Sequence, residues 1–186
     1  FWGASDVLQV PIARELFPLG ENGSITLALF YAMIGIGSGL GPLWLTRILG
    51  DRLRSNLFSI LLGFLLSVIG LYWLSIAGGV LGATLAVLLR SFGGGLVCVY
   101  STTIWQRLAD VEFRGRVASF EFTALTLFQS LGTLWAGYAQ DVLQYTLIET
   151  VRITALVPLL VTLLWGLFVW KVGAMDASKT ALEIKD

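Results

Sequence analysis

Two charged residues stand inside apolar stretches, where a charge is rare and therefore informative. Arg90 lies near the middle of residues 80–104, a long apolar segment, and Asp6 interrupts the apolar start of the chain. A segment of about 20 apolar residues crosses a hydrocarbon core of roughly 30 Å. An arginine halfway along such a segment costs at least ~2.5 kcal/mol and almost never faces lipid. We therefore expect Arg90 to point into a helix bundle, toward a partner or a water-filled cavity.

Simple depth arithmetic places Asp6 and Arg90 at the same level. If the first helical stretch ends near Phe17, Asp6 lies about 11 residues, or ~16 Å, from that boundary. Arg90 lies about 10 residues, or ~15 Å, from the start of its own segment at Val80. Both would then face one interior space near the midplane, either paired or jointly lining a path for substrate and ions. The alternatives are a static buried ion pair and an Asp6 that only caps a broken helix.

Three more residues are candidates for the same pathway. Gly94 belongs to a run of three glycines after Arg90, which lets another backbone approach closely. Glu121 lies about one turn inside residues 117–138 and could carry a proton, or could simply meet interfacial water or Arg116. Gln129, on the same segment, could contact substrate or serve packing.

The composition indicates an integral membrane protein. The chain has 186 residues, of which 56% are hydrophobic and 13% charged, whereas a soluble domain is about 45–50% apolar and about 25% charged. The net charge is zero, so the composition does not indicate a basic face that would bind nucleic acid. Histidine is absent and Cys98 is the single cysteine, which argues against His-ligated or cysteine-cluster metal sites and internal disulfides. We expect no cofactor and no metal, and an enzyme is the least expected class.

The predicted fold class is all-α, a polytopic membrane helix bundle with five full transmembrane helices and one partial N-terminal helix. Residues 1–172 would form the bundle, and residues 173–186 a polar cytoplasmic tail. The chain opens without an initiator Met, so we expect it to begin partway through the partial helix, residues 1–17. The full spans are expected at residues 25–46, 57–77, 80–104, 117–138 and 152–172.

Glycines predict where the helices pack closely. Gly35 with Gly39, and Gly37 with Gly41, form small-xxx-small pairs in the first full span. Ser and Thr recur at helical spacing along residues 117–138, where they could bind a polar substrate or serve interhelical packing.

The basic residues predict an orientation. If the five spans alternate, nine of the twelve Lys and Arg residues fall on one side of the membrane. The positive-inside rule makes that side, with the C-terminus, cytoplasmic in the cell membrane. The nine residues are Arg47, Arg52, Arg54, Arg107, Arg114, Arg116, Lys171, Lys179 and Lys185.

Three short motifs resemble those of the major facilitator superfamily. Residues 49–54, LGDRLR, resemble its G-x-x-x-D-R-x-G-R-[RK] loop, although Arg47 and Arg54 stand where that loop has glycines. Residues 89–94, LRSFGG, are similar to its R-x-x-x-G motif, with Arg90 and Gly94 at the matching spacing. Residues 112–117, EFRGRV, look like the R-G-R-V turn that follows the tenth helix in many efflux-type members.

The resemblance implies that the chain is the C-terminal half of a twelve-helix transporter, from the end of helix seven to helix twelve. Helices seven and ten of that fold line the central cavity, which would place Asp6 and Arg90 there. The resemblance also implies cytoplasmic charge contacts that break and re-form as the two halves rock. The alternative is that these residues only set the orientation. The residues concerned are Asp51, Arg52, Arg54, Arg114 and Arg116.

Together these features predict a secondary active transporter that works by alternating access. We expect proton coupling and, more weakly, efflux of small amphipathic molecules by an antiport mechanism. The expected partners are membrane lipid, a small-molecule substrate, protons and the missing N-terminal six-helix half. The alternative function is a non-transporting membrane scaffold or partner subunit.

Overall fold

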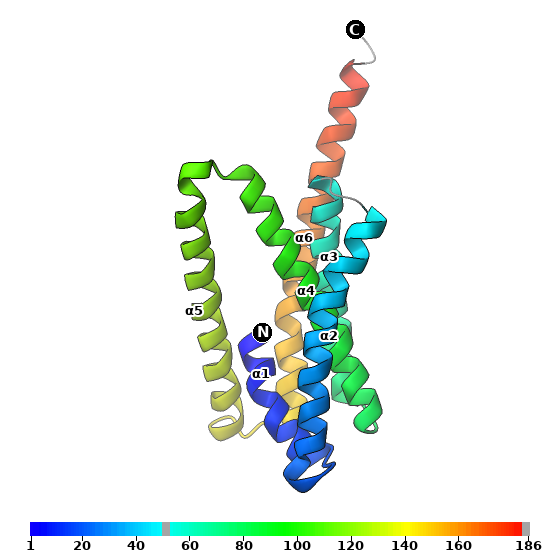
Figure 1. Ribbon diagram of the computed structural model, residues 1–186, viewed down its shortest axis with the longest axis vertical. Coiled ribbons are helices and arrows are strands. Elements are labelled where there is room, and N and C mark those ends of the chain that lie inside the picture. The colour runs from blue at the N-terminus through cyan, green and yellow to red at the C-terminus, as the bar shows by residue number, and fades with distance from the viewer. Residues whose placement is uncertain (50–52, 184–186) are drawn as a thin grey trace.

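The computed structural model describes residues 1–49 and 53–183, and every element in this part of the chain is a helix (Figure 1). The all-α prediction is confirmed. The long helices match the predicted spans, and α6 continues beyond Val172 into the polar tail. The elements are α1 (Trp2–Pro11), η1 (Ile12–Leu16), η2 (Glu21–Gly23), α2 (Ser24–Leu49), α3 (Leu53–Ile76), α4 (Val80–Leu108), η3 (Val111–Phe113), α5 (Arg114–Asp141) and α6 (Leu147–Glu183).

Within the described residues, four helices are long and apolar enough to cross a membrane. These segments are Glu21–Ile48, Leu53–Ile76, Val80–Leu108 and Leu147–Val172. Helix α5 has 28 residues and is long enough, but Glu121, Gln129 and several Ser and Thr residues make it less apolar. The structure therefore supports a membrane helix bundle, whereas the predicted count of five full spans is not confirmed.

Helix α4 is the centre of the bundle. It packs between α2 and α3, and α6 packs against α3. Helix α1 packs mainly on α5, which has little contact with the other long helices. Figure 1 accordingly shows α5 standing to one side of the α2, α3, α4 and α6 group.

Glycines allow α4 to pack closely against α2 and α3. A methyl group added to Gly37 on α2 would come within 2.7 Å of the carbonyl oxygen of Leu88. One added to Gly63 on α3 would come within 2.7 Å of the carbonyl oxygen of Gly93. Of the two predicted pairs on α2, Gly37 and Gly41 meet α4, while Gly35 and Gly39 face open space. Backbone contact of this kind is how small residues join membrane helices without a hydrophobic driving force.

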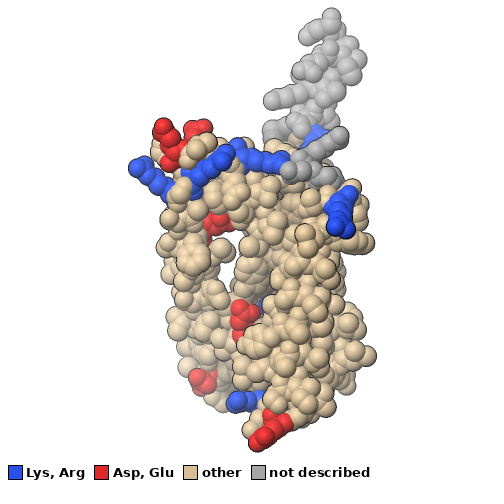
Figure 2. Space-filling view, viewed as in Figure 1, with Lys and Arg blue, Asp and Glu red and all other residues tan. Residues whose placement is uncertain are grey.

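Basic side chains gather at one end of the molecule. The C-terminal ends of α2, α4 and α6 and the N-terminal ends of α3 and α5 all lie toward the top of Figure 1. Figure 2 shows Lys and Arg side chains concentrated at that same end. The long helices alternate in direction in Figure 1, which is the condition that the orientation prediction assumed.

Candidate functional site

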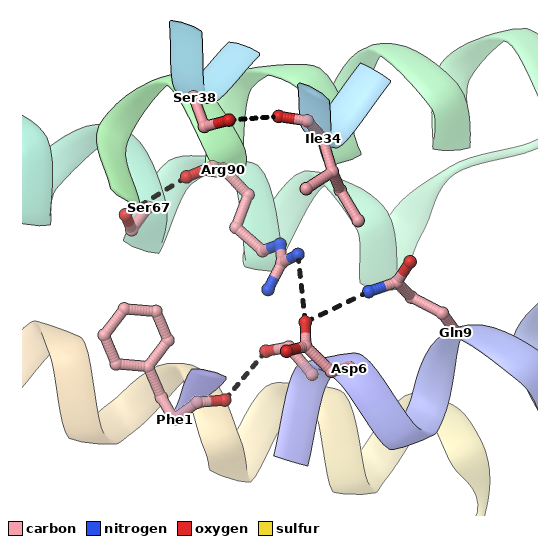
Figure 3. Close-up of polar contacts among 8 residues, drawn as sticks. Phe1, Asp6, Gln9, Ile34, Ser38, Ser67 and Arg90 are labelled. Atoms are coloured by element: carbon pink, nitrogen blue, oxygen red, sulfur yellow. Dashed lines mark hydrogen bonds and ion pairs between the residues drawn. The ribbon is translucent and has the colours of Figure 1, made fainter. Parts of the chain in front are cut away.

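Arg90 and Asp6 come together near the middle of the bundle. Arg90 extends from α4 toward Asp6 on α1 (Figure 3), and its Nη2 lies 3.7 Å from Asp6 Oδ1. The Arg90 side chain is 6% exposed and that of Asp6 is 48% exposed. Their juxtaposition is as predicted from depth along the two helices. The contact is longer than a hydrogen bond, so Asp6 balances the buried charge only loosely.

The α1 side of the site is built on one helix face. Trp2, Asp6 and Gln9 follow each other at intervals of four and three residues, which places them on one side of a helix. Gln9 Nε2 donates a hydrogen bond of 3.2 Å to Asp6 Oδ1. Asp6 therefore has a second partner besides Arg90.

A small closed cavity borders Arg90 in the interior of the helix bundle. It has a volume of about 10 Å³ and is lined in part by Gln9, Arg90 and Thr154. Each of these carries a buried polar atom without a hydrogen-bond partner among the described residues: Gln9 Oε1, Arg90 Nη1 and Thr154 Oγ1. Because this space suits about one water molecule, no organic ligand could reach the guanidinium from this side.

A larger, more open pocket also borders Arg90 and lies between α1, α2, α4 and α5. We call it the polar pocket; its volume is about 250 Å³. The Ser91 hydroxyl lies at its wall, buried and without a hydrogen-bond partner in the described part of the chain. The lining residues are Trp2, Asp6, Ile34, Ser38, Arg90, Ser91, Gly94, Gly95, Cys98 and Gln129.

A second pocket adjoins the first and is mostly apolar. This aromatic pocket, of about 400 Å³, lies between α5 and helices α1, α3 and α4. Trp2 and Gln129 border both pockets. Figure 2 shows the molecule hollowed between α5 and the neighbouring helices. The lining residues are Phe1, Trp2, Phe64, Val97, Phe122, Leu125, Thr126, Phe128 and Gln129.

Two of the remaining predicted pathway residues lie at these pockets, and one does not. A methyl group added to Gly94 would lie 3.1 Å from the indole of Trp2, so Gly94 lets that ring rest on α4. Gln129 borders both pockets. Glu121 lies elsewhere, half-buried, and accepts a hydrogen bond of 3.3 Å from Thr102 Oγ1. Arg116, one of the contacts considered for Glu121, has its guanidinium carbon 5.6 Å from the ring centre of Phe113.

The predicted gating residues are only partly described. Asp51 and Arg52 lie outside the described residues. Arg54 is exposed at the start of α3, and Arg114 Nε donates a hydrogen bond of 3.3 Å to the carbonyl oxygen of Ala109. These side chains lie at the basic end, remote from the two pockets along their helices.

Sequence reasoning missed several of the pocket residues. The helical interval of four from Asp6 could have indicated Trp2. Ser91 carried no signal beyond its position next to Arg90. Phe64 belongs to a helix so apolar that its sequence does not distinguish a pocket wall from a lipid-facing side. Phe128 carried no signal that set it apart from the other large apolar residues of α5.

The geometry suits reversible binding of a small molecule. A buried guanidinium, a half-exposed carboxylate and an aromatic wall lie together, and such an arrangement can hold an amphipathic ligand. In the described ranges, no three or more His, Cys, Asp or Glu side chains lie together as a metal site would require. No family model, curated protein or solved structure matches this chain.

Proposed function

We propose that the chain is part of a secondary active transporter of the major facilitator type. It would carry a small amphipathic molecule by alternating access around the Arg90 site and couple that movement to protons. The three sequence motifs, the membrane-compatible helices and the site near half-depth support this proposal. The basic end would face the cytoplasm.

One observation carries the proposal. Arg90 is buried in α4, one of the membrane-compatible helices, yet it borders an open pocket and has only a loose counter-ion. A charge kept only for stability would be expected in a short, hydrogen-bonded pair, because an unsatisfied buried charge is costly. Intramembrane ionisable residues that face a cavity are typical of substrate and ion pathways.

Transport by the purified protein in proteoliposomes tests the proposal. Fluorescent amphipathic compounds of positive, negative and zero charge would be supplied with and without a pH gradient. We expect accumulation of at least one compound that depends on the gradient. Arg90→Ala should lower its rate at least about tenfold, because the charge at the pathway is removed. Full transport by a well-folded Arg90→Ala protein would contradict the proposal.

A second six-helix half would cover the open side of the site. Phe120, Phe122 and Phe128 on α5 are 76%, 72% and 68% exposed, which fits contact with lipid or with another helical half. A photo-reactive residue at Phe128 should cross-link to such a half, whereas one at Leu81 on α4, 76% exposed, should react with lipid. Cross-linking at Phe128 without transport of any compound would favour the non-transporting partner subunit.

A further inference from the structure

We infer that the ligand of this site is an amphipathic organic acid. Its carboxylate would bind Arg90 and Ser91 in the polar pocket, and its apolar body would lie in the aromatic pocket beside α5. The inference rests on the proposed function only for movement across the membrane, since binding can be measured separately. Three features of the two pockets carry it.

The first feature is the incomplete set of partners around Arg90. Its Nη2 has one carboxylate contact, at 3.7 Å, and that contact is with Asp6, which also lines the polar pocket. Ser91 adds an unpartnered donor at the same pocket wall. A ligand carboxylate that displaces Asp6 from Nη2 would accept a charge-assisted hydrogen bond there, and such bonds are the strong ones. Ser91 would donate a second bond after its side chain rotates toward the ligand.

The second feature is the difference in burial between Arg90 and Asp6. Arg90 is 6% exposed, whereas Asp6 is 48% exposed and already accepts a hydrogen bond from Gln9. Asp6 can keep its hydrogen bonds with Gln9 and with water when Arg90 binds the carboxylate of a ligand instead. A buried charge gains more from a new partner than a half-exposed one does. The site should therefore prefer an anionic head group to a cationic one.

The third feature is that the two pockets adjoin. Trp2 and Gln129 border both, so a molecule held by its head group at Arg90 would extend past these side chains into the aromatic pocket. The aromatic pocket, of about 400 Å³, is large enough for a bicyclic ring system. Apolar surface buried there would add affinity without altering the preference for charge.

Binding of three matched probes to the full chain in lipid nanodiscs tests the inference. The probes are 1-naphthylacetate, 1-naphthylacetamide and 1-naphthylethylamine, measured by isothermal titration calorimetry. We expect 1-naphthylacetate to bind about tenfold or more tightly than the other two. Arg90→Gln should reduce its affinity to that of the amide. Arg14→Gln, the same change at an exposed arginine on η1, should leave it unchanged.

Two further variants separate the head group from the body of the ligand. Asp6→Asn removes the competitor for Arg90, so 1-naphthylacetate should bind a few-fold more tightly. Phe128→Ala should weaken all three probes by a similar factor, since it removes part of the aromatic wall. Asp6→Asn remains informative if Arg90→Gln does not fold.

Equal affinity for the three probes, tighter binding of the amine, or weaker binding of 1-naphthylacetate to Asp6→Asn would overturn the inference. Selective binding without transport in proteoliposomes would leave the inference standing and contradict the proposed function. Gradient-driven transport of the amine alone would support the proposed function and contradict the inference.

Discussion

The Arg90–Asp6 contact has the geometry of a pair that can open. A buried ion pair offsets its desolvation only when its geometry is excellent and its remaining hydrogen-bonding groups are satisfied. Here a single long contact of 3.7 Å joins a buried guanidinium to a half-exposed carboxylate. The backbone of Arg90 packs tightly on α3, since a methyl group added to Gly70 would lie 2.6 Å from the Arg90 backbone nitrogen. The backbone is thus closely packed while the charged head is held loosely.

The three consecutive glycines on α4 should respond differently to the same substitution. A methyl group at Gly93 would clash with the backbone of Gly63, and one at Gly95 with the backbone of Ser38, whereas Gly94 faces only the side chain of Trp2. We expect Gly93→Ala and Gly95→Ala each to destabilise the protein by about 1–3 kcal/mol. Gly94→Ala should cost less, because the Trp2 ring can shift. Thermal unfolding of the three purified variants in detergent measures this order.

One result would contradict this predicted order of stabilities. If Gly94→Ala lowered the midpoint of thermal unfolding as much as its two neighbours do, α4 would not be wedged between α2 and α3 by Gly93 and Gly95.

At the scale of elements, the sequence predicted which segments are helical but not which of their faces meet. Long apolar segments bounded by turn residues located α2, α3, α4 and α6 well. Helix α2 is apolar on all sides, so periodicity could not choose between its two glycine pairs. Only the packing against α4 selects Gly37 and Gly41.

The position of α5 was the least predictable part of the site. Its Ser and Thr stripe suggested substrate binding or interhelical packing, yet Ser119, Thr123 and Ser130 are exposed. Each of their hydroxyls donates to a carbonyl oxygen four residues earlier in the same helix. Such local bonds satisfy a hydroxyl without any partner helix. Helix α5 is positioned instead by contact with α1, a long-range feature that no local pattern encodes.

Gly132 should control how α5 docks on α1. A methyl group there would lie 3.0 Å from the backbone nitrogen of Ala4, while one at Gly137 on the same helix meets no atom within 4 Å. We expect Gly132→Val to push α5 away from α1, and Gly137→Val to leave it in place. Cross-linking between Thr102→Cys and Glu121→Cys measures the shift, because these native side chains are 3.3 Å apart.

The cross-linking would use a short bifunctional thiol reagent in a Cys98→Ser background. Gly132→Val should slow the reaction several-fold, as expected when overpacking displaces a helix. Equal rates in the Gly132→Val and Gly137→Val proteins would mean that the α1–α5 contact does not position α5.

At the scale of the whole molecule, the site could be predicted in part because depth in a membrane can be calculated from sequence. Asp6 and Arg90 were matched by counting residues from helix ends, and the structure brings them together. The walls of the two pockets depend on side-by-side packing of α1, α4 and α5, which residue counting cannot supply. The distribution of basic residues could be predicted in the same way, because helices that alternate in direction bring basic residues from distant segments to one end (Figure 2).

That charge asymmetry yields a prediction about orientation. Gly78, in the α3–α4 turn, and Gly115, at the start of α5 on the basic end, both have room for a side chain, since a methyl group at either meets no atom within 4 Å. In a Cys98→Ser background, a membrane-impermeant maleimide should label Gly78→Cys in intact cells. It should label Gly115→Cys only after permeabilisation, at least about tenfold more than before, because basic loops are retained in the cytoplasm. The reverse pattern would show that the bundle is inverted. Labelling of both in intact cells would show that the two ends do not lie on opposite sides of the membrane, and the half-depth position of Arg90 would lose its basis.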